Sequence, residues 1–408
     1  MTRNDYLNHI WKPYPAMPYS SLAAGRIYRI QKEGESLDLT LLRDQKTHKI
    51  HFEKGPPYSE FLQEGDLVAV VSAAEICLLA PQKQALPPRH FQKDLFEKWS
   101  LYLQALRNFF QQQGFLELRT PSLVACPGTE PSLDVFATPL KVGSFQKKLF
   151  LPTSPELHLK KALSLGAEKI FEIANCYRNG EVTERHQPEF LMLEWYRAYE
   201  NLTSIKQDVQ NLISHLASAL RLTGPEKVRS YSVAELFKIH CDFDFLPTTT
   251  QEELKALAHK LGVDVRSAES IDDFFFLIFM EKIESQLPPD ELIFVEKYPP
   301  YQAALARLTD DGWGDRFEVY WKGLELANAF HELNDPSLQR QRSNEDLQKK
   351  NDLGKEAITL DEEFFVCLEA GMPPSGGIAL GVERLFMAFE GISEISELRL
   401  FPWRSPNS

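Results

Sequence analysis

The clearest pattern along this chain is a pair of apolar segments separated by a charged turn. Residues 171–177 and 190–196 are mostly apolar, which predicts two strands joined as a hairpin. Glu194 interrupts the second segment between Leu193 and Trp195. A carboxylate in a buried strand needs a cation or another polar partner. The hairpin therefore indicates a site for a charged ligand, although a surface hairpin with solvated charges would show the same pattern.

Two further segments share this mixture of apolar and polar positions. Residues 325–335 carry carboxylates and asparagines among apolar residues, and residues 375–386 form a glycine-rich strand that runs into a helix predicted to begin near Val382. Glycine lets the backbone approach a ligand closely, and the start of a helix favours anions. Arg384 lies in the first turn of this helix, where its guanidinium can bind phosphate oxygens. Three such segments together favour a ligand site.

Helical periodicity predicts further elements around these segments. A helix over residues 92–113 is followed by an alternating strand over residues 115–119. A shorter helix is predicted over residues 249–261, with Thr249 and Glu252 as its capping box.

The proline-rich, polar segment 80–90 predicts a boundary between a domain over residues 1–88 and one over residues 89–408. Residues 200–295 of the larger domain are interpreted as an insertion between the charged segments. Short apolar segments in the first domain predict a small all-β fold, and their number and length suit an oligonucleotide-binding (OB) barrel. The predicted strands cover residues 25–31, 37–42, 49–52, 67–72 and 76–79.

Composition narrows the classes of function. The 408 residues include 45 Lys and Arg and 58 Asp and Glu, for a net charge of −13. Residues 1–90 hold 11 basic and 10 acidic residues (+1), and the remainder hold 34 and 48 (−14). Such an acidic body argues against broad, non-specific nucleic-acid binding. The sequence contains no segment of about 20 apolar residues that could span a membrane. Its five cysteines are scattered without C-x-x-C spacing, which disfavours a zinc site or a disulfide framework and favours a reducing cytoplasm.

The three charged segments resemble the second and third signature motifs of class II aminoacyl-tRNA synthetases, most of all the lysine-specific subclass. The resemblance covers roughly residues 90–403 and includes residues 153–160 and 316–318. It implies an α+β fold with an antiparallel sheet flanked by helices, preceded by the small all-β domain. It also implies ATP and Mg²⁺ as cofactors, and a homodimer whose interface is built by the helix and strand of residues 92–119.

The resemblance assigns a phosphate-binding role to the charged turn. Activation joins a carboxylate to the α-phosphate of ATP, and two anions can meet only if cations bracket them. Arg178 matches the arginine that binds the α-phosphate and the carboxylate, and Arg384 the arginine that binds the far phosphates. His186 matches a residue that reaches the terminal phosphates, and Phe190 the ring that stacks under adenine. The family usually has Arg-Asn-Glu in this turn, whereas here a glycine displaces the adenine-contacting glutamate to Glu181.

Glu318 and Glu325 match the acidic pair that holds magnesium against the phosphates. A few hard oxygen ligands, with the nucleotide supplying the rest, are what Mg²⁺ requires. The alternating pattern around both residues would equally suit solvated carboxylates on a strand face.

The resemblance also implies a pocket for a diamino acid. Glu332 and Tyr196 would bind the distal ammonium group, and Glu156 the amino group nearer the carboxylate. Lysine–tRNA ligases typically have glycine at the position of Ala379, whereas shorter relatives that ligate (R)-β-lysine to elongation factor P have alanine. The residues that match the lysine-type pocket are Glu156, Glu194, Tyr196, Asn328, Phe330 and Glu332.

These matches predict an ATP-dependent ligase that activates lysine or (R)-β-lysine as an adenylate and transfers it to a lysine of elongation factor P. One alternative is a lysine–tRNA ligase, with the basic residues Arg26, Arg29 and Arg43 in a reduced anticodon-binding domain. Another is a non-catalytic paralogue, which the presence of both Arg178 and Arg384 disfavours. The first domain could equally be a module that docks another molecule or stabilises the protein, with no role in binding RNA.

Overall fold

The computed structural model describes residues 1–11, 23–44, 46–82, 92–303 and 305–403. The chain divides into two units, Met1–Glu97 and Lys98–Ser408, which are described separately below. The boundary expected between residues 88 and 89 lies outside the described residues. No helix in the described part of the chain is long and apolar enough to cross a membrane.

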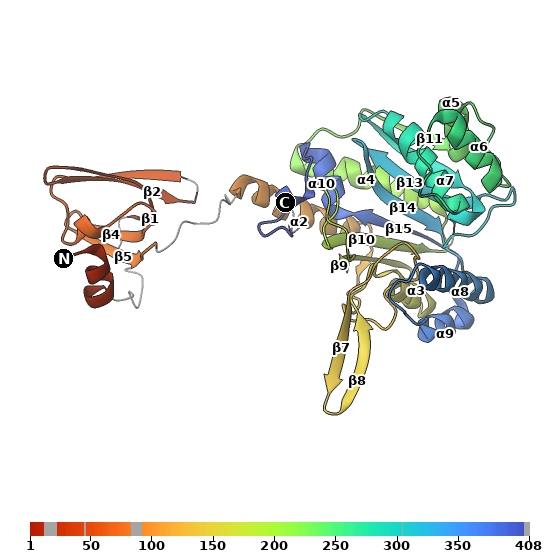
Figure 1. Cartoon of the computed structure of the whole chain (residues 1–408), viewed down its shortest axis with the longest axis horizontal. Helices are drawn as coiled ribbons and strands as arrows, with labels where there is room; N and C mark the ends of the chain where they lie inside the picture. Colours follow the sequence, from red (N-terminus) through yellow and green to blue (C-terminus); the bar gives the residue numbers. More distant parts are fainter. Residues whose placement is uncertain (12–22, 45, 83–91, 304, 404–408) are drawn as a thin grey trace. The chain divides into compact units, whose positions relative to one another are not determined.

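The first unit is built on a five-stranded antiparallel sheet in the order β3-β2-β1-β4-β5 (Figure 1). Its core comes from alternate strand positions, such as Leu37, Leu39 and Leu41 of β2, which are all buried. The buried Asp66 pairs with Arg3 of the short helix α1 (Arg3–Asp5) at 2.6 Å. The small all-β domain is thus observed. Its strands are β1 (Ala23–Glu33), β2 (Ser36–Arg43), β3 (Lys46–Phe52), β4 (Leu67–Ser72) and β5 (Glu75–Ala80).

The second unit contains an eight-stranded sheet in the order β11-β12-β13-β14-β15-β10-β9-β6. The expected antiparallel sheet is mixed, because β11 pairs parallel with β12 and β6 pairs parallel with β9 at the two edges. The charged hairpin predicted from the sequence is formed by β9 and β10. The strands are β6 (Leu116–Glu117), β9 (Lys169–Tyr177), β10 (Glu189–Ala198), β11 (Lys227–Ser232), β12 (Glu291–Tyr298), β13 (Gly314–Trp321), β14 (Leu324–His331) and β15 (Ser375–Gly381).

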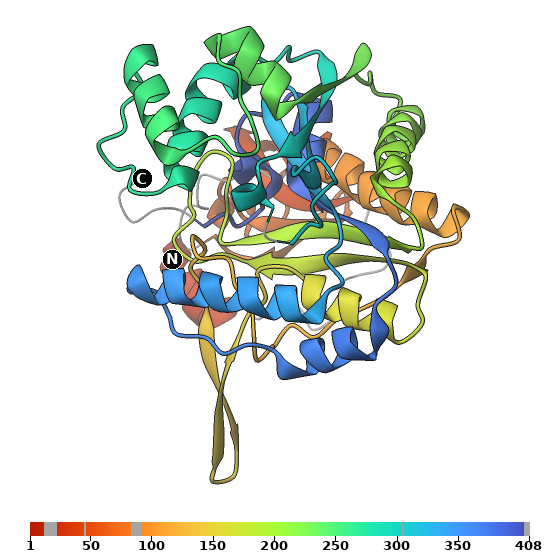
Figure 2. The same cartoon turned by 90° about the vertical axis from the view of Figure 1, so that its right-hand side faces the viewer.

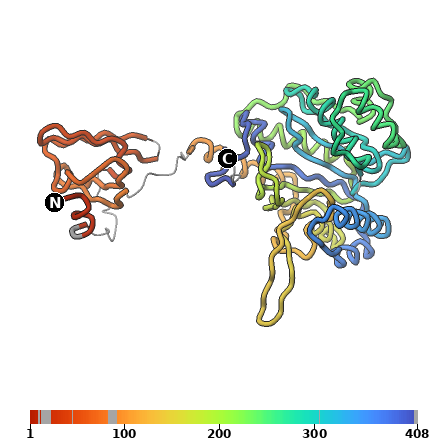
Figure 3. The backbone as a smooth tube through the Cα atoms, viewed as in Figure 1, coloured from red at the N-terminus to blue at the C-terminus, as the bar shows by residue number. Residues whose placement is uncertain are grey.

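Helices cover one face of this sheet. Phe110 of α2 (Lys93–Gln112) stacks on Phe171 of β9 with ring centroids 4.7 Å apart, and α4 (Leu202–Leu220) contacts β14 and β15. The helix α10 (Val382–Glu390) begins where β15 ends, as predicted. The helices α3 (Glu156–Ser164), α8 (Pro336–Asp352) and α9 (Glu362–Gly371) lie together beside the sheet (Figures 1 and 2). The hairpin of β7 (Ala137–Val142) and β8 (Phe145–Phe150) projects from this unit (Figure 3).

The segment interpreted as an insertion, residues 200–295, supplies two strands of the sheet, β11 and β12. It also supplies α4, which packs on the sheet. Its remaining helices, α5 (Val233–Cys241), α6 (Gln251–Leu261) and α7 (Ile271–Ile278), share a separate aromatic core with β12 and β13. The capping box of α6 is Thr250 with Glu253, so the prediction of Thr249 and Glu252 was wrong by one residue. Thr249 instead accepts a hydrogen bond from the backbone N–H of Leu246.

A buried ion pair fastens α4 to the sheet. Asp208 of α4 accepts two hydrogen bonds from Arg197 of β10, at 2.7 and 2.8 Å, and one from the indole of Trp195 at 3.2 Å. Removing one partner of such a pair leaves a charge buried without compensation.

We predict that Asp208→Ala lowers the free energy of unfolding by about 3–5 kcal/mol. The matched control is Glu200→Ala, because Glu200 pairs with the same Arg197 from a more exposed position, where an ion pair contributes only about 0–1 kcal/mol. Urea unfolding of the full chain measures both, and equal losses would contradict the prediction.

Candidate active site

A cavity of about 440 Å³ opens on the face of the sheet opposite α4. It is lined by every predicted site residue except Glu318, so the structure brings together residues from four separate segments of the chain. These residues are Glu156, Arg178, Glu181, His186, Phe190, Glu194, Tyr196, Glu325, Asn328, Phe330, Glu332, Ala379 and Arg384.

Strand register explains why residues so distant in sequence meet here. Successive side chains of a strand point to opposite faces, and directly paired residues of neighbouring strands share a face. Glu194 pairs with Ala379, which pairs in turn with Asn328. In the next row of the same face, Tyr196 and Phe330 flank a glycine of β15. The alternate residues of β10 point instead towards the helices.

A β-bulge brings Glu325 into the site. Asn328 and Glu325 are three positions apart, so a regular strand would place them on opposite faces. Between Val319 and Tyr320 the register of β13 against β14 shifts by one residue, so that Tyr320 pairs with Glu325. The extra residue in β14 turns Glu325 towards the cavity, which is a common role for bulges beside functional sites.

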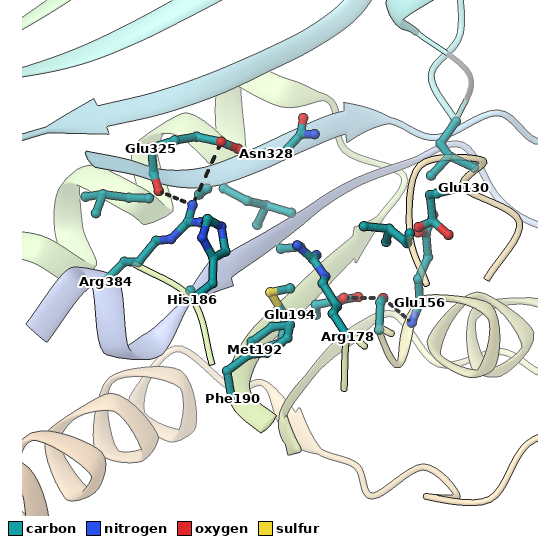
Figure 4. Close-up of a pocket in the computed structure, with 18 of the residues that line it drawn as sticks. Glu130, Glu156, Arg178, His186, Phe190, Met192, Glu194, Glu325, Asn328 and Arg384 are labelled. Carbon is teal, nitrogen blue, oxygen red and sulfur yellow. Dashed lines mark hydrogen bonds and ion pairs between the residues drawn. The ribbon is translucent and has the colours of Figure 1, made fainter. Parts of the chain in front are cut away.

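Arg384 and His186 form one end of the site (Figure 4). Arg384 donates to the backbone carbonyl of Glu325 at 3.0 Å and lies 2.6 Å from His186 Nε2. A guanidinium can only donate, so Nε2 accepts and Nδ1 carries the proton towards Thr183 Oγ1, 2.9 Å away. Burial and the neighbouring arginines, Arg384 first, lower the pKa of His186 to about 4. This end therefore combines a neutral imidazole with an available cation.

Arg178 occupies the middle of the cavity (Figure 4). It follows β9, and its backbone N–H donates to the carbonyl of Pro188 across the turn at 3.0 Å. Its guanidinium lies over the ring of Phe190, 5.1 Å from the centroid. Its Nε is buried and finds no hydrogen-bond partner among the described residues. A buried, unpaired guanidinium N–H beside a cavity is suited to an anionic ligand.

Buried carboxylates form the other end of the site. Glu194 is only 1% exposed and accepts hydrogen bonds from Ser154 Oγ at 2.5 Å and from Tyr196 Oη at 3.1 Å. Burial and the nearby charge of Glu156 raise the pKa of Glu194 to about 8. Burial also raises the pKa of Glu130, a residue of the cavity lining that the sequence analysis did not identify.

A buried lysine accompanies two of these carboxylates. Lys160 Nζ pairs with Glu332 at 2.5 Å and with Glu156 one helical turn earlier. Sequence analysis did not single out Lys160, which lies four residues after Glu156 and so shares one face of α3 with it. Burial raises the pKa of Glu332, and the charge of Lys160 opposes that shift.

Glu318 lies beside the cavity and is absent from its described lining. It accepts hydrogen bonds from the hydroxyls of Tyr298 at 2.5 Å and Tyr320 at 2.6 Å, and pairs with Arg316. Burial and the charge of Glu318 together raise the pKa of Glu325. Two carboxylates that repel each other could share a divalent cation, although no cluster of three potential metal ligands occurs among the described residues.

The displaced glutamate of the turn still reaches the cavity. Gly180 adopts a left-handed conformation (φ +81°), which glycine enters without steric cost. The following Glu181 lines the cavity, with its carboxylate 4.0 Å from His186 Nε2. The extra residue therefore leaves Glu181 within the site.

Comparison with known proteins places the chain in a family. The family model described as "tRNA synthetases class II (D, K and N)" matches residues 86–405. The elongation factor P–(R)-β-lysine ligase of Avibacterium paragallinarum is 36% identical over 301 residues, which cover 72% of this chain and 91% of that protein. The ligases of the same name from Hamiltonella defensa (33%; 74% and 92% covered) and Mannheimia succiniciproducens (34%; 78% and 98% covered) are similar. The chain belongs to the class II tRNA synthetase family of the D, K and N type.

Proposed function

We propose that this chain is an ATP-dependent ligase that activates (R)-β-lysine, or lysine, as an adenylate and transfers it to a lysine of elongation factor P. The observation that carries the proposal is the division of charge within one cavity. Arg384 and Arg178 provide cationic groups towards one end, and buried carboxylates including Glu194 and Glu332 form the other. This division matches a substrate with a carboxylate at one end and two ammonium groups further along.

The phosphates of ATP would lie between Arg178 and Arg384, with the adenine against Phe190. Negative charge grows on the α-phosphate as the carboxylate attacks it, and fixed cations stabilise that charge. Neutral His186 can donate no proton from Nε2, so it would hold Arg384 in position without competing for phosphate. Glu325, supported by Glu318, would hold Mg²⁺, which would neutralise phosphate charge when bound.

The carboxylates at the amino-acid end would select a diamino acid, because each of them needs a cationic partner. Glu332, Glu194 and Glu156 would receive the two ammonium groups, and a monoamino acid would leave a buried carboxylate unpaired. Gly377 keeps this end open, since a Cβ there would lie 2.2 Å from Glu332 Oε1. Ala379 lies between Glu194 and Asn328, where its methyl group would favour an amino group shifted by one carbon.

The acceptor is supported by the names of the relatives and by a second cavity. This cavity, of about 540 Å³, shares Glu130, Ser154 and Glu156 with the first. Its acidic lining, which includes Asp272 and Asp346, would attract a cationic acceptor lysine. A homodimer in the cytoplasm, with an OB-like first unit, completes the proposal. The exposed Leu116 of β6 is consistent with the dimer interface that the family builds there.

The first prediction concerns the reaction itself. In ATP–pyrophosphate exchange, the full chain is expected to use (R)-β-lysine in preference to (S)-β-lysine and lysine. Labelled amino acid is then expected to appear on elongation factor P. Label on tRNA instead would establish the lysine–tRNA ligase alternative, and absence of exchange with all three amino acids would contradict the proposal.

The second prediction tests the methyl group of Ala379. Ala379→Gly is expected to change the ratio of kcat/KM between (R)-β-lysine and lysine by about tenfold in favour of lysine, since a single methyl group in a pocket is worth about 1–3 kcal/mol. Ala329→Gly removes the same group from the opposite face of β14, outside the cavity lining. An equal change in both variants would exclude a specific role for Ala379.

The third prediction follows from the raised pKa of Glu194. An ammonium group binds the ionised carboxylate, so KM for the diamino acid is expected to fall about tenfold between pH 6.5 and 8.5, as Glu194 ionises through a pKa of about 8. KM for ATP, measured over the same range, serves as the control. The Gln side chain of Glu194→Gln cannot ionise, so this variant should lose the pH dependence of KM for the diamino acid. If the pH dependence persists in the variant, another group is responsible for it.

A further inference from the structure

Lys160 lies behind the amino-acid end of the cavity. It is 1% exposed, and it is absent from the described residues that line the cavity. Its Nζ bridges Glu156 of its own helix α3 and Glu332 of β14, which both line the cavity. A buried lysine between two substrate-facing carboxylates acts on both of them at once.

We propose that Lys160 is a positioning residue that orients Glu156 and Glu332 to receive the ammonium groups of the substrate and favours the ionised form of Glu332. This inference rests on the proposed function, because it assumes a diamino acid in this cavity. It adds to that function a residue which touches no substrate and sets the charge of the groups that do.

The charges around Lys160 show why such a residue is needed. Glu156 acts on it from α3, Glu332 from β14 and Glu194 from β10. The Tyr196 hydroxyl donates to Glu194, and Glu130, in the loop before β7, interacts with Glu156. Burial alone would lower the pKa of Lys160, but Glu156 and Glu332 outweigh it, so the pKa is raised and the amine stays charged. Without this cation Glu332 and Glu194 would hold their protons more tightly, and a protonated carboxyl cannot form an ion pair with an ammonium group.

The neighbouring residue offers a matched control. Lys161 is also buried and also bridges two carboxylates, Asp361 at 2.7 Å and Glu363 at 2.7 Å. Neither of these lines the cavity, and the Glu363 side chain is 77% exposed. The two adjacent lysines therefore differ mainly in whether their partners face the substrate.

The test compares Lys160→Met, Lys161→Met and Lys160→Arg in ATP–pyrophosphate exchange with (R)-β-lysine at pH 7 and pH 9. Lys160→Met is expected to raise KM for the diamino acid at least tenfold at pH 7, with part of the loss recovered at pH 9, where Glu332 ionises. KM for ATP should stay unchanged. Lys161→Met should keep the wild-type ratio of KM at pH 7 to KM at pH 9. Lys160→Arg keeps the positive charge and should also show the wild-type ratio.

A second measurement needs no substrate. A carboxyl whose pKa is raised on folding binds its proton more tightly in the folded state, so stability falls as pH rises towards the folded pKa. Without Lys160 this pKa rises further, so the melting temperature of Lys160→Met should fall more between pH 7 and 9 than that of Lys161→Met. If Lys160→Met does not fold, Lys160→Gln takes its place.

The outcomes separate the two proposals. If the wild-type chain exchanges with no diamino acid, the proposed function fails, while the melting temperatures still report on the charge-setting role. Equal pH dependence of the melting temperature in the Lys160 and Lys161 variants would overturn the inference. So would a Lys160→Met variant whose KM for the diamino acid matches that of the wild type.

Discussion

The site depends on one constraint: several of its ionisable side chains, including Glu194, Glu318 and Glu332, are buried, so each of these charges needs a partner. The opposite face of the sheet carries apolar residues and a buried ion pair between Arg197 and Asp208. On the site face, hydroxyl groups satisfy Glu194 and Glu318. An orphaned buried charge is among the costliest defects in a folded chain. The few groups left incompletely paired, such as Arg178 Nε, are therefore the best indicators of where a ligand binds.

The separation of these charges also orients the ligand. Figure 4 shows Arg384 and His186 at one end, Arg178 and Glu194 near the middle, and Glu156 and Glu130 towards the other end. A molecule with phosphates, a carboxylate and ammonium groups can satisfy this arrangement in one direction only, because reversal would place like charges together.

Sequence patterns could predict the features that depend on local periodicity. The apolar segments on either side of the charged turn predicted the hairpin, and the glycines before Val382 predicted the junction of β15 and α10. The bulge that turns Glu325 towards the cavity could not be predicted, because it arises from the register of β13 against β14. The same holds for the ion pair between Lys160 and Glu332, because Glu332 lies 172 positions later in the sequence. The capping box of α6 was misplaced because two adjacent threonines each precede a glutamate by three residues, and only the backbone conformation decides between them.

The turn between β9 and β10 shows why a change of motif length need not disturb a site. Within the turn, the backbone N–H of Arg178 donates to the carbonyl of Pro188, and Thr183 pairs with His186. The end of the chain supplies further support: the N–H of Ile395 donates to the carbonyl of Glu184, and Trp403 and Gln187 exchange hydrogen bonds. Because these contacts come from outside the turn, they fix its position independently of its length. The added Gly180 can then be absorbed as a left-handed residue, and Arg178 and His186, on either side of it, keep their places along the cavity.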